Sequence, residues 1–251
     1  MSSPAQIPTP LRRPRFGTGL LHPKPQKAPR PSKADLNIYF EALLNAYGPQ
    51  HWWPGRTRFE VIVGAILTQN TAWTNVVTAI RNLRSAGLLT PRAIDQVPLA
   101  QFARLIRSSG YFRQKARKLK AFVQFLQKQY AGSLTKMFQT PTLKLRDQLL
   151  AIWGIGPETA DSILLYAGGH PVFVVDAYTR RMLERHSLID GKSTYEEIRA
   201  LFEHQLPRDA RIYNEFHALI VHTGKNYCRA NNPNCAACPL QRFLPESRAL
   251  S

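Results

Sequence analysis

The chain has 251 residues, which is long enough for one or two domains with a sizeable hydrophobic core. It carries 34 Lys and Arg against 16 Asp and Glu, and the resulting formal charge of +18 indicates a polyanionic partner. An apolar fraction of 44% excludes a wholly disordered chain, and no apolar run approaches the roughly 18 residues that a membrane span needs.

The first 34 residues differ in composition from the rest. They contain eight prolines and seven Lys or Arg but no acidic residue. Because proline fixes φ and lacks a backbone donor, we expect residues 1–34 to be a disordered basic tail, either a solvated linker or an arm that adds phosphate contacts. No apolar signal segment follows the initiator Met, and three cysteines are too few for a secreted disulfide framework, so we expect an intracellular protein.

Helical periodicity dominates from residue 35 onward, so the predicted fold class is all-α. The predicted helices lie at 36–43, 57–70, 76–83, 112–130, 142–152, 157–167, 176–186, 193–204 and 208–225. The apolar run 172–175 is expected to be a short buried segment rather than a strand. The helix from residue 112 opens with five cations that we expect to contact phosphates, namely Arg113, Lys115, Arg117, Lys118 and Lys120.

The segment 147–167 predicts two helices joined by the tight turn Gly154-Ile155-Gly156. Pro157 suits a first helical position, and an apolar stripe follows it. Free N–H groups in such a turn and at the following helix N-terminus form an anion site, which is typical of a helix-hairpin-helix that binds a DNA phosphate without reading bases. The alternative is an ordinary helical corner in which glycine serves packing.

Asp176 lies 20 residues after Gly156, at the end of an apolar run and at the start of a predicted helix. Here the sequence resembles the endonuclease III superfamily of helix-hairpin-helix DNA glycosylases, over roughly residues 36–240. The resemblance is carried by LTQN (67–70), SSGYFRQKA (108–116), GIGPETA (154–160), VVDAYTRR (174–181) and the cysteine cluster. Asp176 would stabilise the positive charge that builds on the sugar when the base leaves; it also suits an N-cap, and the two roles are compatible.

The resemblance implies two helical lobes that flank a DNA-binding cleft. The terminal lobe would comprise 35–56 plus 170–251 with the cysteine loop, and a six-helix lobe with the hairpin would comprise 57–169. DNA would be held at the hairpin by Gly154, Ile155, Gly156, Glu158 and Thr159. We expect a monomer that binds double-stranded DNA with a damaged base, flips the nucleotide into the cleft and has no membrane association.

Glu158 occupies the position where bifunctional members of this family carry a nucleophilic lysine. A carboxylate cannot form a Schiff base with the sugar, so the resemblance implies base release without strand cleavage by the imine route. Glu158 also suits the positive end of the helix dipole.

Aromatic residues precede and follow the helix at 57–70. They are Trp52, Trp53 and Trp73, with Pro54 beside them. This pattern looks like the 3-methyladenine DNA glycosylase III branch, because an indole face attracts a cationic alkylated purine; the alternative is that these residues pack the core. Gln69 matches the family residue that fills the gap left by the flipped base. Lys225 would approach the cleft or be solvated.

Cys228, Cys235 and Cys238 reproduce the first three ligands of the family's [4Fe-4S] loop, whereas the fourth position, 244, is Leu. The site would hold an iron–sulfur cluster with a fourth ligand such as Glu246 or Ser247, hold zinc, or be a remnant without metal.

The sequence therefore predicts a monofunctional DNA glycosylase that excises alkylated purines. One alternative is a glycosylase for another lesion, such as an oxidised, deaminated or mismatched base. The other is a catalytically silent helix-hairpin-helix DNA-binding protein.

Overall fold

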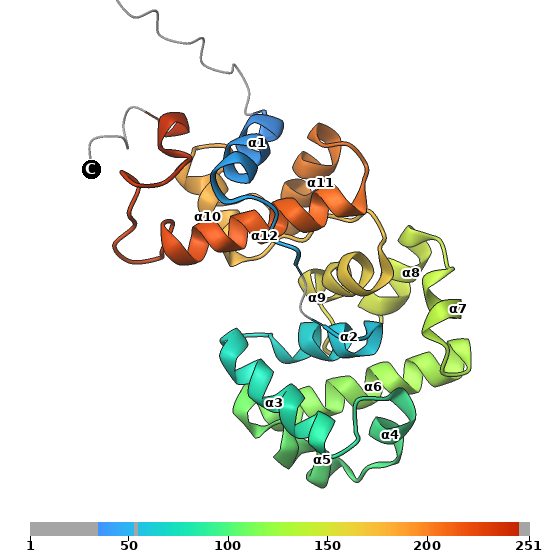
Figure 1. Cartoon of the computed structure of the whole chain (residues 1–251). Helices are drawn as coiled ribbons and strands as arrows, with labels where there is room; N and C mark the ends of the chain where they lie inside the picture. The colour runs from blue at the N-terminus through green and yellow to red at the C-terminus, as the bar shows by residue number, and fades with distance from the viewer. Residues whose placement is uncertain (1–34, 53–54, 246–251) are drawn as a thin grey trace, which may run out of the picture. The chain divides into compact units, whose positions relative to one another are not determined.

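A computed structural model describes residues 35–52 and 55–245, and within these ranges every regular element is helical (Figure 1). The all-α prediction is therefore confirmed. The tail at 1–34 lies outside the described residues. The elements are α1 Leu36–Tyr47, α2 Arg58–Leu67, α3 Trp73–Ser85, α4 Pro91–Gln96, α5 Leu99–Leu105, η1 Arg107–Ser109, α6 Phe112–Tyr130, α7 Leu134–Phe138, α8 Thr142–Leu150, α9 Pro157–Ser162, η2 Ile163–Gly168, α10 Ala177–Arg185, α11 Tyr195–Gln205, α12 Ala210–Asn226 and η3 Gln241–Phe243.

The structure refines several expected elements. The single helix expected at 157–167 is α9 followed by a π-helical turn, η2, and the run 172–175 is buried without strand pairing. Three short helices, α4, α5 and α7, were not predicted. Each has fewer than eight residues, which is too short for the helical period to stand out in sequence.

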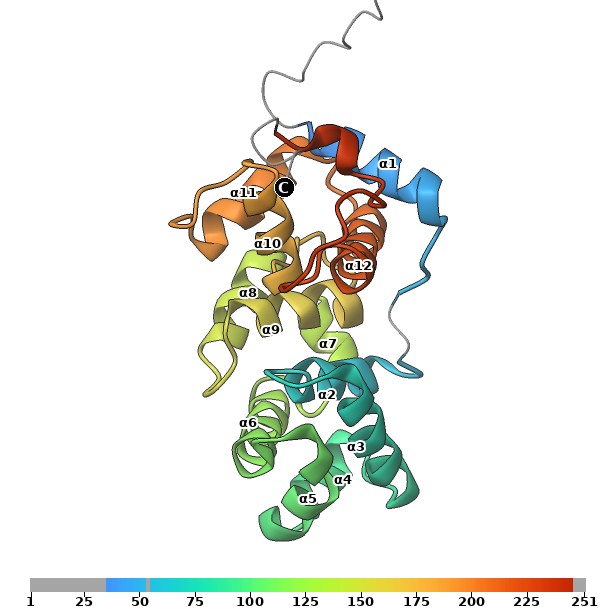
Figure 2. The same ribbon diagram turned by 90° about the vertical axis from the view of Figure 1, so that its left-hand side faces the viewer.

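Two buried apolar clusters organise the described residues. The first includes Phe59 through Val172 and is built from α2 to η2, whereas the second joins α1 to α10, α11 and α12. Figure 2 shows α1, α10, α11 and α12 toward one end and α2 to α6 toward the other, with α8 and α9 between them. We call them the hairpin lobe and the terminal lobe; the residue boundaries expected from the sequence remain a proposal. The two lobes meet where η2 packs on both α2 and α12.

None of the helices in the described ranges has the length and apolar character that crossing a bilayer would require.

Candidate active site

A cleft of about 780 Å³ is lined by residues from both lobes. Its walls come from the end of α2 and the start of α3, the hairpin, the start of α10 and the inner face of α12. Many of the side chains singled out in the sequence line it, among them Trp52, Gln69, Trp73, Glu158, Asp176 and Lys225. Residues that are up to 173 positions apart in sequence therefore share one solvent-accessible space, since Trp52 and Lys225 are both part of its lining.

Asp176 is the N-cap of α10 and also faces the cleft. One carboxylate oxygen, Oδ1, accepts hydrogen bonds from the backbone N–H of Thr179 at 2.8 Å and from its hydroxyl at 2.9 Å. The other oxygen, Oδ2, lies 3.5 Å from Nε2 of His217. Burial raises the pKa of Asp176, but His217 and the bonds from Thr179 outweigh it and hold this pKa below its usual value. The capping role fixes the carboxylate and keeps it ionised.

His217 was not identified from the sequence. It lies on α12 with only 5% of its surface exposed, and its Nδ1 is hydrogen-bonded to the hydroxyl of Tyr166 on η2. Tyr166 thus orients the imidazole so that the opposite nitrogen, Nε2, points at Asp176. Burial raises the pKa of Tyr166 well above its usual value, with the charges of Asp176 and Glu158 acting in the same direction, so its hydroxyl stays protonated.

Glu158 lies in the first turn of α9 and lines the same cleft. Burial raises its pKa, the charge of Asp176 raises it further, and His217 lowers it. The pKa values of the two carboxyl groups are therefore shifted in opposite directions: that of Asp176 is lowered and that of Glu158 is raised. Pairs whose pKa values are driven apart in this way are typical of sites that use one group as an acid and the other as a charge.

The hairpin turn presents backbone donors to solvent. Gly154 has φ +82°, a left-handed conformation, and a Cβ there would lie 2.6 Å from the side chain of Lys118. No described residue accepts a hydrogen bond from the N–H of Gly156 or Glu158. Ile155 is buried, so only its backbone is available to a ligand. This geometry supplies an anion site built from main-chain groups.

Gln69 ties the end of α2 to the hairpin. Its side-chain amide donates to the hydroxyl of Thr159 at 2.8 Å and to the carbonyl of Gly154 at 3.3 Å, and its oxygen accepts from Nζ of Lys118 at 2.5 Å. Thr159 is largely buried at the edge of the cleft, where its hydroxyl accepts the Gln69 bond that ties the turn to α2.

Two of the cations on α6 do not face solvent as expected. Lys115 is 2% exposed, and its ammonium donates to the carbonyls of Leu67 at 2.8 Å and Ser109 at 2.5 Å. Lys120 donates to the carbonyls of Asp95 and Val97. The expectation that all five cations contact phosphates is therefore wrong for Lys115, whose ammonium is buried against carbonyls at nearby helix ends; for half-buried Lys120 it stays a prediction.

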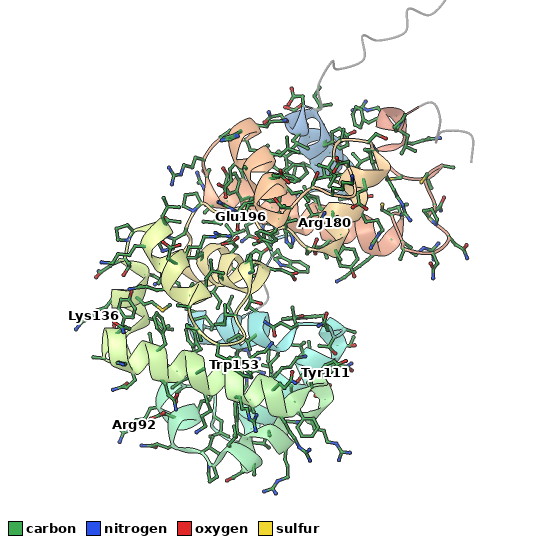
Figure 3. The ribbon with its side chains drawn as sticks, turned by 180° about the vertical axis from the view of Figure 1, so that it is seen from behind. Arg92, Tyr111, Lys136, Trp153, Arg180 and Glu196 are labelled. Carbon is green, nitrogen blue, oxygen red and sulfur yellow. The ribbon has the colours of Figure 1, made fainter. Side chains whose placement is uncertain are left out.

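Aromatic side chains line the cleft on two sides. Trp52 and Trp73 both contribute to its wall, and the ammonium of Lys225 lies 5.6 Å from the centre of the Trp52 ring. Trp53 and Pro54 lie outside the described residues. Two other aromatic side chains, Trp153 and Tyr111, were not singled out in the sequence and are 58% and 69% exposed (Figure 3).

The three cysteines line one small enclosed pocket beside α10, together with Leu244. Arg185 donates to Sγ of Cys228 at 3.2 Å, and Arg181 donates to its carbonyl at 2.7 Å. Burial raises the pKa of the Cys238 thiol. Among the described residues no three His, Cys, Asp or Glu side chains are placed so that they could hold a metal ion, and the fourth position is an aliphatic side chain. The described residues thus do not fit a four-thiolate cluster; Glu246 and Ser247 lie outside them.

Comparisons with known proteins agree with this geometry. The model of the HhH-GPD superfamily of base excision DNA repair proteins matches residues 63–208. A protein of Methanocaldococcus jannaschii, named by inference as a DNA repair glycosylase, is 48% identical over 81% of this chain and 93% of its own length. The crystal structure of an H. pylori 3-methyladenine DNA glycosylase bound to 1,N6-ethenoadenine is 30% identical, with a TM-score of 0.66 over 76% of this chain and 98% of that chain. An endonuclease III–DNA complex has the same fold, with a TM-score of 0.74 at 23% identity over 85% of this chain and 95% of that one.

Proposed function

The chain belongs to the HhH-GPD superfamily of base excision DNA repair proteins, and we propose that it is a monofunctional DNA glycosylase that hydrolyses the N-glycosidic bond of alkylated purines. The observation that carries this proposal is the pair of carboxyl groups with opposed pKa shifts, Asp176 and Glu158, in a cleft walled by Trp52 and Trp73.

The substrate is a base in duplex DNA, which an enzyme can reach only by extruding the nucleotide from the stack. Main-chain donors at the hairpin would hold a phosphate of the damaged strand. Lys118 and Gln69 stand between the hairpin and the cleft, so the extruded nucleotide would pass beside them. Arg113 and Arg117, on the opening turns of α6, add charge for the flanking backbone.

Asp176 would act as the electrostatic stabiliser of the reaction. As the bond from sugar to base breaks, positive charge develops on the sugar ring, and a fixed anion lowers the energy of that state. Thr179 and His217 hold the carboxylate in place and keep it ionised before substrate arrives. The remaining oxygen, Oδ2, would orient the water that completes hydrolysis.

Glu158 would supply the proton that a neutral leaving base requires. Its raised pKa increases the fraction present as the neutral acid, whereas an amine at this position would form an imine. A base that is already cationic, such as 3-methyladenine, leaves without this proton, so the demand on Glu158 is smallest for such substrates.

The aromatic wall would favour cationic bases. An indole face attracts a cation with about 1–2 kcal/mol when it is desolvated. The position of the Lys225 ammonium above the Trp52 ring supports this choice, because it places a cation against that face. The resemblance to a 3-methyladenine glycosylase bound to a modified adenine supports the same substrate class.

The proposal is tested with DNA treated with a methylating agent. Released bases are separated by chromatography, and the products are then heated in mild alkali to reveal abasic sites. We expect release of 3-methyladenine, intact strands before heating, and no protein–DNA adduct after borohydride reduction. A reduced adduct would show that another amine, such as Lys225, attacks the sugar, and Lys225→Met would identify it. No released purine would refute the substrate class.

A further inference from the structure

A second hollow lies on the hairpin lobe, outside the cleft. It has a volume of about 300 Å³ and runs between the start of α2 and one face of α3. Its floor is formed by Trp73, Val77 and Ile80, which follow one another at helical spacing on α3. We call it the arginine groove, because Arg56, Arg81 and Arg84 form its rim.

The charge of this groove is only partly balanced. Glu60 is the acidic residue of its lining, and it is paired with Arg84 at 2.8 Å. No carboxylate in the described part of the chain lies within ion-pair distance of Arg56 or Arg81, and both side chains are exposed. Two guanidinium groups are therefore directed at one hollow without a protein anion, an arrangement that suits a bidentate phosphate ligand.

The groove and the cleft adjoin at Trp73, which lines both. A polyanion that binds across the cleft and extends past the start of α3 would therefore contact the arginine groove. The hairpin, which belongs to α8 and α9, lies on a different part of the cleft wall, so the groove and the hairpin would contact different phosphates.

We propose that the arginine groove is a second phosphate-binding site, in which Arg56 and Arg81 hold the backbone of duplex DNA beyond the nucleotides that enter the cleft. This inference rests on the proposed function, because DNA is the polyanion that the cleft would bind. The groove adds affinity and orientation and takes no part in bond breaking.

The test measures how binding depends on salt for duplexes of two lengths. Both carry a stable abasic-site analogue at the centre; one extends about one helical turn, roughly 10 base pairs, to each side, and the other about half as far. For the double variant Arg56→Gln and Arg81→Gln on the long duplex, the slope of log K against log salt should fall by about 1.8, since each phosphate contact contributes about 0.9. On the short duplex the double variant and the unaltered protein should have equal slopes.

The matched control is Arg92→Gln, which removes an exposed arginine on α4 of the same lobe (Figure 3). It should leave both slopes unchanged, and circular dichroism should show equal helix content in all variants. Equal slopes for the double variant and the control on the long duplex would overturn the proposal, as would an equal reduction on both duplexes. If the unaltered protein neither binds DNA nor releases a base, the proposed function fails instead; if it does both, only the groove is in question.

Discussion

The two ends of α10 carry charged side chains that make different kinds of contact. At the N-terminus, Asp176 is a half-buried carboxylate; Thr179 bonds one of its oxygens and His217 faces the other. At the C-terminus, Arg185 holds the cysteine loop through Sγ of Cys228 and the carbonyl of Ala230. At the first end, a negative charge lies in a cleft that substrate would enter. At the second end, a positive side chain holds a loop in place. Under the proposed function, one helix of nine residues would serve chemistry at one end and hold a loop in place at the other.

The largest effect is expected at the N-terminal end. Asp176→Asn keeps the shape of the side chain and removes the charge that would steady the sugar cation. Single-turnover release of 3-methyladenine should fall by about 10²–10³, the usual loss for an electrostatic stabiliser, while DNA affinity changes by only a few-fold. Turnover above about a tenth of the original rate would show that the carboxylate is only a helix cap.

The pH dependence of excision tests the second carboxyl group of the site, Glu158, together with Asp176. Excision of a neutral lesion such as hypoxanthine would require Asp176 ionised and Glu158 protonated, so this activity should fall in acid through the lowered pKa of Asp176 and in base through the raised pKa of Glu158. Glu158→Gln should abolish the alkaline decline and reduce excision of a neutral lesion, hypoxanthine, by about tenfold or more. An unchanged alkaline limb would assign that titration to another group.

The cleft wall should give an intermediate effect. Trp73→Leu keeps apolar bulk but removes the π face, so excision of 3-methyladenine should fall about 5–30-fold more than excision of hypoxanthine. Both rates are measured in single-turnover assays, and far-UV circular dichroism serves as the control for folding. Equal losses on both substrates would mean that Trp73 packs the lobe and does not select cations.

The smallest effect is expected at the C-terminal end of α10. Arg185→Gln removes hydrogen bonds to Cys228 and Ala230 and should lower the free energy of unfolding by about 1–2 kcal/mol, with a melting temperature a few degrees lower. Base release from bound DNA should stay at the original rate. A large loss of excision with normal stability would mean that the loop contributes to the site, and the contrast between the two ends would fail.

The sequence predicts those parts of the molecule that local pattern encodes. The long helices follow from apolar periodicity, and the hairpin follows from two glycines and a proline between apolar runs. Asp176 is found because it stands at a boundary between an apolar run and a helix, at a fixed distance from the hairpin. These features depend on neighbours in the chain, so no tertiary information is needed to see them.

Other features depend on contacts between distant segments. His217 lies in the apolar run FHALIV of α12, and only packing of α12 against η2 shows that it faces Tyr166 and Asp176. A lone histidine in an apolar run is nevertheless a usable signal, because burial of a polar ring calls for partners. Lys115 shares the helical face of Phe112, Leu119 and Phe122, so its position on the stripe could have separated it from the exposed cations beside it.

The cation over the Trp52 ring has a consequence for how the enzyme would tell damaged from normal DNA. The ammonium of the protein's own Lys225 already lies against the face of that indole. A normal, uncharged base that stacks on this indole would displace the Lys225 ammonium without replacing its cation–π attraction. An alkylated purine would replace that attraction with its own positive charge. The contact between Lys225 and Trp52 would thus impose a free-energy cost on stacking that an alkylated purine recovers and a normal base does not. This cost would disfavour the large excess of undamaged bases.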